Sequence, residues 1–212
     1  RTSLVVPMEP ITKTTSIINN DSLSIVYGTT RTNSSSTRVS LPAILMGLVP
    51  TSATSEEYHR QPTLWNIAKA LGYSTFFITP QNWDWQNLDL FFLQKQVDHV
   101  VTAKQMGAPF VNNAGVDDRR ILDSTNSHFL RLQSAEKPFF GVIQFNCTHQ
   151  PYNSGNPGES LTANSPELYQ ASTRYLDSLI AQIYDQLNNA GLKNKTLIIV
   201  TSDHGESFKF RG

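Results

Sequence analysis

Two adjacent residues near the end of the chain, Asp203 and His204, are of the types that bind divalent metal ions. They follow the apolar, β-branched run 196–200, which is short enough to form a strand buried on both faces. In open α/β sheets, ligands bind beyond the carboxyl ends of the strands. Gly205 permits a sharp turn and a close approach of the backbone to a ligand. On these residues alone, a metal site and an ordinary polar turn are equally good interpretations.

A second candidate for chemistry is Thr37, which ends a loop rich in hydroxyl groups. A helical pattern begins at Arg38, and Pro42 is expected in its first turn. Backbone N–H groups and the helix dipole at such a position favour an anion or a developing alkoxide. The alternative is that Ser36 or Thr37 only caps the helix with its hydroxyl, which is the commoner use of such residues. The local sequence alone favours the cap.

A third candidate is His149, which follows the apolar run 139–145 just as His204 follows its own run. The histidine at position 99 lies in an apolar strand pattern and is interpreted as structural, whereas His59 and His128 are expected at the surface. Cys147 is the single cysteine, so no internal disulfide can form, and we interpret it as a small buried apolar residue.

Patterns typical of strands and helices alternate along the chain. Helices are expected over 10–20, from Arg38, over 64–71, over 117–133 and from Ser165 to Gly191, and strands over 23–27, 73–79, 97–101, 139–145 and 196–200. This alternation predicts an α/β fold, a three-layer α/β/α sandwich with a mostly parallel central sheet. Trp83 and Trp85 follow the second of these strands, and we expect them to cover an edge of the core rather than line a cleft.

The composition sets outer bounds on function. The chain has 212 residues, which is enough for one domain with a substantial core. Its formal net charge is zero, so it lacks the basic footprint of a nucleic-acid-binding protein. No apolar run approaches the ~20 residues that span a bilayer. Because the chain opens on Arg1 without a methionine, we expect it to be a piece of a longer protein.

Several motifs occur in an order that resembles a known family. They are Thr37 with Val39-Ser40-Leu41-Pro42 and Ile44-Leu45-Met46-Gly47, then Leu71-Gly72-Tyr73-Ser74-Thr75-Phe76-Phe77-Ile78, then Thr148-His149-Gln150-Pro151-Tyr152, the helix with Tyr175 and Asp177, and Ser202-Asp203-His204-Gly205-Glu206-Ser207. The ordered set resembles the sulfatase-like branch of the alkaline phosphatase superfamily. It is most similar to the membrane-anchored phosphoethanolamine and phosphoglycerol transferases.

The resemblance implies roles for five residues. Thr37 would be the nucleophile and a metal ligand, Asp203 and His204 would be metal ligands, His149 would hold the substrate phosphate or a second ion, and Glu206 would orient a ligand. The cofactor would be Zn²⁺ or another divalent cation such as Mn²⁺ or Mg²⁺. Residues 1–212 would form part of an alkaline phosphatase-like catalytic domain that is incomplete at both ends.

The resemblance also implies partners and a location. The expected reaction moves a phosphoethanolamine-like group from a phospholipid-like donor to an envelope glycan or lipid acceptor through a covalent threonine intermediate. The parent protein would lie in a bacterial inner membrane, anchored by segments outside this chain, with a periplasmic or extracellular catalytic domain. No nucleic acid is expected as a partner.

Some residues depart from the family pattern. True sulfatases convert a Cys or Ser to formylglycine, which Thr37 cannot become, so sulfatase chemistry is disfavoured. A rival alignment pairs Ser34 with Arg38 but breaks the spacing to Gly47. The envelope transferases usually have several disulfides, which a chain with one cysteine lacks. The family takes a further acidic ligand from upstream of residue 1 and a histidine from downstream of Gly212, so we expect an incomplete metal site here.

Two other functions stay open from the sequence. One is hydrolysis of sulfate or phosphate esters on the same scaffold. The other, from a different class, is a non-catalytic sensor or binding domain that has kept the fold.

Overall fold

The structure is a computed structural model that describes residues 24, 25, 27, 30–48, 60–84, 97–156, 165–206 and 208. The expected helix over 10–20, His59 and Trp85 lie outside these residues. Of the expected strand over 23–27, three residues are described, and they form no strand; Ile25 and Tyr27 are exposed. That strand prediction is wrong for the described positions, because alternating apolar residues form a strand only where a neighbouring strand pairs with them.

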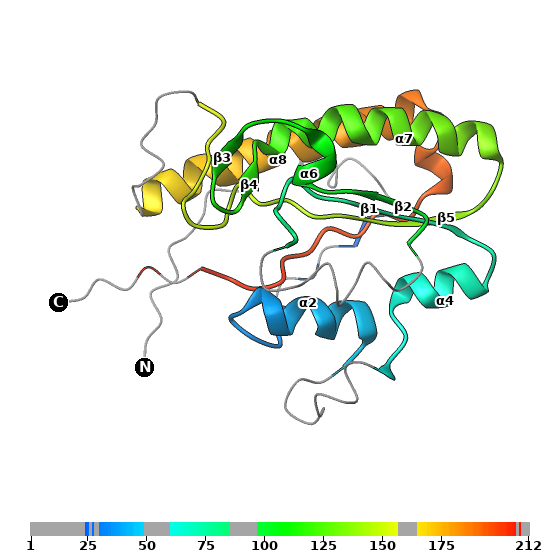
Figure 1. Ribbon diagram of the computed structural model, residues 1–212, viewed down its shortest axis with the longest axis horizontal. Coiled ribbons are helices and arrows are strands. Elements are labelled where there is room, and N and C mark those ends of the chain that lie inside the picture. Colours follow the sequence, from blue (N-terminus) through cyan, green and yellow to red (C-terminus); the bar gives the residue numbers. More distant parts are fainter. Residues whose placement is uncertain are drawn as a thin grey trace.

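A three-stranded parallel sheet forms the centre of the fold. Its strands are β1 (Ser74–Ile78), β2 (His99–Val101) and β5 (Phe139–Ile143), in the order β2-β1-β5. Helices α2 (Thr37–Met46) and α4 (Leu64–Ala70) lie on one face of the sheet, and α7 (Ile121–Ala135) and α8 (Pro166–Asn189) on the other (Figure 1). The predicted α/β sandwich with a parallel sheet is confirmed.

Alternate side chains of β1 divide the core into two clusters. Phe76 and Ile78 pack with residues of α7 and α8, whereas Phe77 packs on the opposite face against residues of α2 and α4. Trp83 belongs to the second cluster: it is buried, and its ring centroid lies 4.3 Å from that of Phe77. The expectation that this tryptophan covers the core is confirmed.

Local sequence signals account for the helix ends. Ser165 caps α8 by accepting a hydrogen bond from the Leu168 amide at 3.1 Å, and Pro166 takes the first helical position. Gly47 ends α2 with a φ of 66°, a conformation that favours glycine. The helix begins at Thr37, one residue before the expected start, and Pro42 lies inside it rather than in its first turn, which corrects the expected place of this proline.

Several short elements follow β2 and precede α7 along the chain. They are α6 (Ala103–Met106), β3 (Phe110–Asn112), β4 (Gly115–Val116) and the 3-10 turn η2 (Asp118–Arg120), and a second 3-10 turn, η3 (Lys193–Lys195), follows α8. The sequence did not predict them as separate elements, because two to four residues are too few to show a period.

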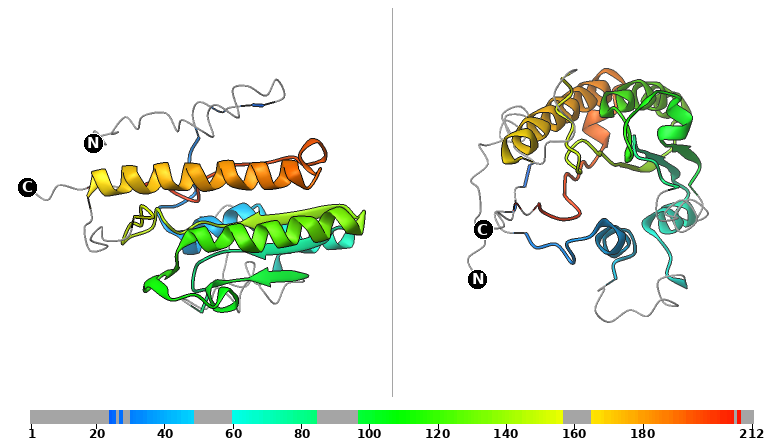
Figure 2. Two further views of the ribbon diagram at one scale, coloured as in Figure 1. Left: turned by 90° about the horizontal axis from the view of Figure 1, so that it is seen from above. Right: turned by 60° about the vertical axis from the view of Figure 1, so that its left-hand side comes forward.

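Residues 196–200 correct the strand that was expected there. The segment forms no ladder with the described strands, and Leu197 and Ile199 are 86% and 77% exposed. It runs from the end of α8 towards the start of α2 (Figure 1, Figure 2). An apolar, β-branched run forms a buried strand only where neighbours cover its edges and faces, and the described residues do not supply them.

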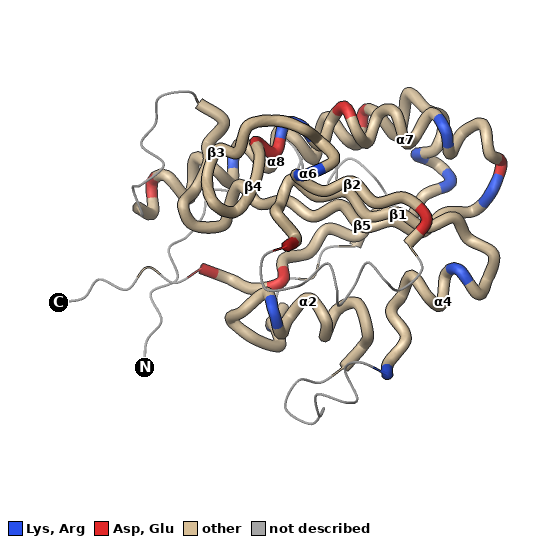
Figure 3. The backbone as a smooth tube through the Cα atoms, viewed as in Figure 1, with Lys and Arg blue, Asp and Glu red and all other residues tan. Residues whose placement is uncertain are grey.

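Charged residues are mixed over the fold rather than gathered on one side (Figure 3). This agrees with the net charge of zero. Among the described residues, no helix has the length and apolarity that crossing a membrane requires.

A pair of histidines, His99 of β2 and His128 of α7, packs between the sheet and this helix. The rings of His99 and His128 are stacked, with centroids 4.4 Å apart, and the Arg131 guanidinium lies 3.1 Å from Nε2 of His99 and 3.4 Å from Nδ1 of His128. The surface position expected for His128 is wrong, since its side chain is only 7% exposed and packs against the Phe76 ring. Burial, followed by the positive charges of His99 and Arg131, lowers the pKa of His128 from 6.5 to about 4.

This lowered pKa makes the stability of the chain depend on pH. The unfolded chain takes up a proton at His128 near pH 6.5 and the folded chain only near pH 4, so stability present above that interval is lost as the pH falls through it. We expect the free energy of unfolding to fall by about 1–3 kcal/mol on this account between pH 7 and pH 4. Urea unfolding at stepped pH should show the fall, and the variant His128→Leu should flatten it. The control is His149→Gln, which changes an exposed histidine and should keep the fall. An equally steep fall in His128→Leu would contradict the assignment.

Candidate active site

Thr37 is the first residue of α2, and Ser36 occupies the cap position before it. Ser36 has the extended backbone of a cap, but its hydroxyl makes no capping hydrogen bond. The hydroxyl of Thr37 is directed away from its own helix: its Oγ1 lies 3.1 Å from Nε2 of His204, a residue 167 positions later. The interpretation of Thr37 as a simple cap therefore does not describe its contact in the fold.

The hydrogen bonds of His204 determine which ring nitrogen carries the proton. Nδ1 lies 2.9 Å from the carbonyl oxygen of Gly205, and a carbonyl can only accept. Nδ1 is therefore the protonated nitrogen of the neutral ring, and Nε2 bears the lone pair that faces Thr37. This orientation suits two uses: Nε2 can accept the threonine proton, or it can bind a metal ion.

Asp203 completes a cluster of three side chains. Its Oδ2 lies 3.6 Å from Nε2 of His204, and its Oδ1 accepts a hydrogen bond from the His204 amide at 3.0 Å. Ligand atoms bound tetrahedrally to one Zn²⁺ at about 2.0 Å lie about 3.3 Å from one another. The observed separations of 3.1 and 3.6 Å from Nε2 lie on either side of that value, so the spacing fits a shared ion.

Thr32 joins the loop before α2 to this cluster. Its hydroxyl donates to the backbone carbonyl of Asp203 at 2.5 Å and also lies 3.2 Å from the hydroxyl of Ser40, a buried residue of α2. The sequence analysis did not single out Thr32. The only signal for it was its place in the hydroxyl-rich loop, where nothing in the sequence distinguishes one hydroxyl from the next.

A tyrosine joins the segment of Glu206 to the loop that carries His149. The hydroxyl of Tyr152 donates a hydrogen bond to the Glu206 carboxylate. Tyr152 is fully buried, and burial followed by the neighbouring carboxylate raises the pKa of its hydroxyl. His149 lies three residues earlier on the same loop, exposed, with Nδ1 2.6 Å from the carbonyl of Gln150. The Tyr152–Glu206 bond thus brings the loop of His149 to the loop of Asp203 and His204.

The ends of β1 and β5 hold these loops at one edge of the sheet. Gln144, just after β5, donates to Oε1 of Gln81, just after β1, at 2.9 Å, and it accepts from the Trp83 indole at 3.1 Å. This is the carboxyl edge of a parallel sheet, where ligands bind in open α/β folds.

The donor set fits part of a metal site. A carboxylate, an imidazole and a hydroxyl suit Zn²⁺, but within the described residues no group of three or more His, Cys, Asp or Glu side chains could hold a metal ion. Asp203 and His204 would thus supply two of the four ligands that a closed site needs.

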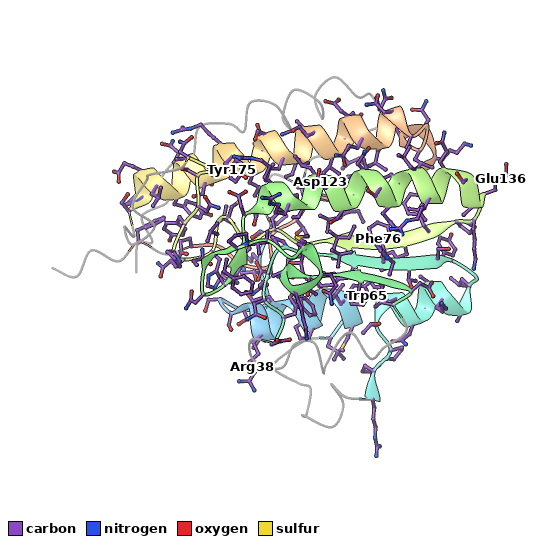
Figure 4. All side chains as sticks on the ribbon, turned by 45° about the horizontal axis from the view of Figure 1, so that its top comes forward. Arg38, Trp65, Phe76, Asp123, Glu136 and Tyr175 are labelled. Atoms are coloured by element: carbon purple, nitrogen blue, oxygen red, sulfur yellow. The ribbon has the colours of Figure 1, made fainter. Side chains whose placement is uncertain are left out.

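The rival alignment through Ser34 and Arg38 has less support from the geometry. The Ser34 hydroxyl accepts from the Ser36 amide at 3.2 Å within its own loop. Arg38 is exposed and extends away from the fold (Figure 4). The contact with His204 is made by Thr37.

Comparisons of sequence relate the chain to known proteins. A family model described as sulfatase matches residues 22–211. The chain is 27% identical over 137 residues to lipoteichoic acid synthase 1 of Bacillus subtilis, covering 62% of this chain and 20% of that protein. It is 31% identical over 100 residues to an endo-4-O-sulfatase of Bacteroides thetaiotaomicron, covering 36% of this chain and 20% of that protein. The chain spans about one fifth of the length of these relatives.

Solved structures with a similar fold include two bacterial proteins. One is a protein of the alkaline phosphatase superfamily from Vibrio parahaemolyticus, with a TM-score of 0.59, 23% identity, and coverage of 74% of this chain and 40% of that one. The other is the lipoteichoic acid synthase LtaP from Listeria monocytogenes, with a TM-score of 0.62, 14% identity, and coverage of 76% and 42%. At these identities the likeness establishes the fold, an alkaline phosphatase-like α/β sandwich.

The His204 tautomer can be tested directly. We expect long-range ¹H–¹⁵N spectra of the chain to show the Nδ1–H form of His204, because its Nδ1 donates to Gly205. The variant Thr37→Val should shift the Nε2 signal, since it removes the hydroxyl at 3.1 Å. Ser36→Ala, which removes the neighbouring hydroxyl, is the matched control and should leave that signal in place. An Nε2–H ring, or equal shifts in both variants, would contradict the geometry.

Proposed function

This chain belongs to the sulfatase family, and on that premise we propose that its parent protein is an enzyme that transfers a phospho-group through a covalent intermediate on Thr37. Residues 1–212 are, in this proposal, part of the catalytic domain of a longer protein. The observation that carries the proposal is the 3.1 Å contact between the Thr37 hydroxyl and Nε2 of His204.

The proposed roles follow from where each side chain lies. Thr37 Oγ1 attacks the phosphorus, loses its proton and forms a new P–O bond. The lipid oxygen of the donor is displaced and takes up the proton that the threonine has lost. An acceptor hydroxyl then attacks the same phosphorus, the bond to Thr37 breaks, and the acceptor's proton returns to the threonine. Splitting the transfer in this way replaces one difficult step by two easier ones.

Four further residues support these steps. Asp203 and His204 would hold a divalent cation, with Zn²⁺ the ion that their donor atoms suit best. Bound there, the cation would favour the ionised form of the Thr37 hydroxyl and offset the charge on the phosphoryl oxygens. His149 would hold the phosphate from the neighbouring loop, and Glu206 would keep that loop against Asp203 and His204 through its bond with Tyr152.

The donor is proposed to be a glycerophospholipid. Two relatives, from Bacillus subtilis and Listeria monocytogenes, are lipoteichoic acid synthases, which favours phosphoglycerol as the transferred group. The sequence motifs favoured a phosphoethanolamine-like group, and both reactions need the same attack by threonine on a phosphodiester. An envelope glycan or lipid would be the acceptor, and the catalytic domain would face the periplasm or the cell exterior.

A second candidate is hydrolysis of a phosphate or sulfate ester at the same site. The similarity to an endo-4-O-sulfatase favours it. Threonine at position 37 weighs against the sulfatase form, because a threonine cannot yield the aldehyde that sulfatases use.

The transferase proposal predicts a covalent adduct on Thr37. The whole protein, incubated with Zn²⁺ and vesicles containing both phosphatidylglycerol and phosphatidylethanolamine, should carry a phospho-group on the peptide that contains Thr37. The added mass, measured by mass spectrometry, distinguishes phosphoglycerol from phosphoethanolamine. Thr37→Ala should abolish the adduct and lower turnover at least about 10³-fold, because the nucleophile is lost. Ser36→Ala, the adjacent hydroxyl, is the control and should keep both. Normal turnover by Thr37→Ala would rule the proposal out.

The same assay tests the metal. Removing divalent cations with a chelator should abolish adduct formation, and Zn²⁺ should restore it. His204→Ala should lower the zinc content of the protein, measured by inductively coupled plasma mass spectrometry, because one of the proposed ligands is removed. His128→Leu, which removes a histidine far along the fold from this cluster, should leave the zinc content unchanged. Equal zinc in the protein and in His204→Ala would exclude His204 as a ligand.

A further inference from the structure

Asp118 is a buried carboxylate to which the proposed chemistry gives no role. It opens the 3-10 turn η2, which leads into α7, and its side chain is 1% exposed. None of the ion pairs found among the described residues includes it. A buried carboxylate without a cationic partner must be offset by hydrogen bonds, so the identity of its donors shows what it is doing in the fold.

Among the described residues, the groups that donate hydrogen bonds to the Asp118 carboxylate all belong to one loop. Oδ2 of Asp118 accepts the backbone amides of Asn146 at 2.8 Å and of Cys147 at 2.7 Å. The thiol of Cys147 donates to the same carboxylate. Burial raises the pKa of Asp118 to about 6, and the bonds from Asn146 and Cys147 act in the opposite direction.

These contacts fix the turn that carries His149. The amide of His149 donates to the carbonyl of Asn146 at 2.9 Å, and the amide of Asn153 returns to the carbonyl of Cys147 at 2.9 Å. The two residues whose amides bind Asp118 are therefore the two whose carbonyls close the turn and its return. Hydrogen bonds to a charged acceptor are roughly twice as strong as neutral ones, which suits an anchor for a turn that must not shift.

The same 3-10 turn also binds the far end of the loop. The guanidinium of Arg119 donates to the carbonyl of Gly155 at 3.0 Å and lies over the Tyr175 ring, 5.7 Å from its centroid. The Tyr175 hydroxyl in turn donates to Asp117 at 2.5 Å. Residues 117–119 thus hold the loop 146–155 at both ends, with exposed His149 between them.

We propose that Asp118 is a positioning residue for His149, holding the loop after β5 so that this imidazole faces the substrate phosphate. The inference rests on the proposed function, because it gives His149 a phosphate to hold. It adds a residue that touches neither substrate nor metal and acts only through the backbone of residues 146 and 147.

The first test compares two substitutions with a stability control. Bis(4-nitrophenyl) phosphate is offered to the whole protein with Zn²⁺, and kcat/KM for its hydrolysis is measured. Asp118→Ala should lower kcat/KM about 10- to 100-fold, the usual cost of removing such a support. Asp118→Asn should lose less, because its carbonyl oxygen can still accept both amides. Leu179→Ala, which truncates a buried side chain of α8, should also lower thermal stability but should keep kcat/KM.

A double-mutant cycle separates positioning from general stability. On the background of His149→Ala, adding Asp118→Asn should cause no further loss of kcat/KM, because the two residues act as a unit. Additive losses would overturn the inference. So would a His149→Ala variant with full activity, or a loss in Leu179→Ala equal to that in Asp118→Ala.

A measurement without turnover keeps the inference testable if the proposed function is wrong. In ¹H–¹⁵N spectra of the chain, Asp118→Asn should move the ring signals of His149, and Leu179→Ala should leave them in place. Unmoved signals in Asp118→Asn would overturn the inference whatever the enzyme does. Hydrolysis without an adduct on Thr37 would instead contradict the proposed transfer. The double-mutant cycle would then still decide whether Asp118 acts through His149.

Discussion

The contact between the Thr37 hydroxyl and Nε2 of His204 is the interaction on which the candidate site depends. It joins two segments 167 residues apart, one at the start of a helix and the other in an extended loop. Either residue alone has an ordinary interpretation, as a helix cap or as a polar turn. Their meeting places an alcohol next to the lone pair of an imidazole, where the two groups could share a proton or a bound cation.

Side-chain hydrogen bonds, rather than sheet pairing among the described residues, hold the segment with Asp203 and His204 in place. Thr32 holds the backbone of Asp203, Thr37 holds the ring of His204, and Tyr152 binds Glu206. Each of the three comes from a different part of the chain. The apolar residues just before the segment are exposed. After it, the Phe208 ring packs against Tyr152 and Tyr169, so these polar contacts and the aromatic packing together define its position.

A parallel sheet brings such segments together as a consequence of its topology. The loops after β1 and β5 leave the same edge, and the bond from Gln144 to Gln81 joins them there. Behind them, η2 supports the loop of His149 from the side of α7 and α8. The layer of helices that covers the sheet thus also supports the loops at its edge, which links the core to the site.

The sequence by itself determined the elements with a strong period or clear end signals: α4, α7, α8, β1 and β5 all lie where the patterns predicted them. It also indicated the family, because the motifs at Thr37, His149 and Asp203 occur in a fixed order. It failed where the outcome depended on neighbours. Residues 196–200 have a strand's composition but no pairing with the described sheet, and His128 has a polar side chain but packs against Phe76. Tertiary structure alone decided which hydroxyl of a crowded loop meets His204 and which buried carboxylate supports the loop of His149. No local pattern carries that information, because these contacts span tens to hundreds of residues and form only when the sheet edge assembles.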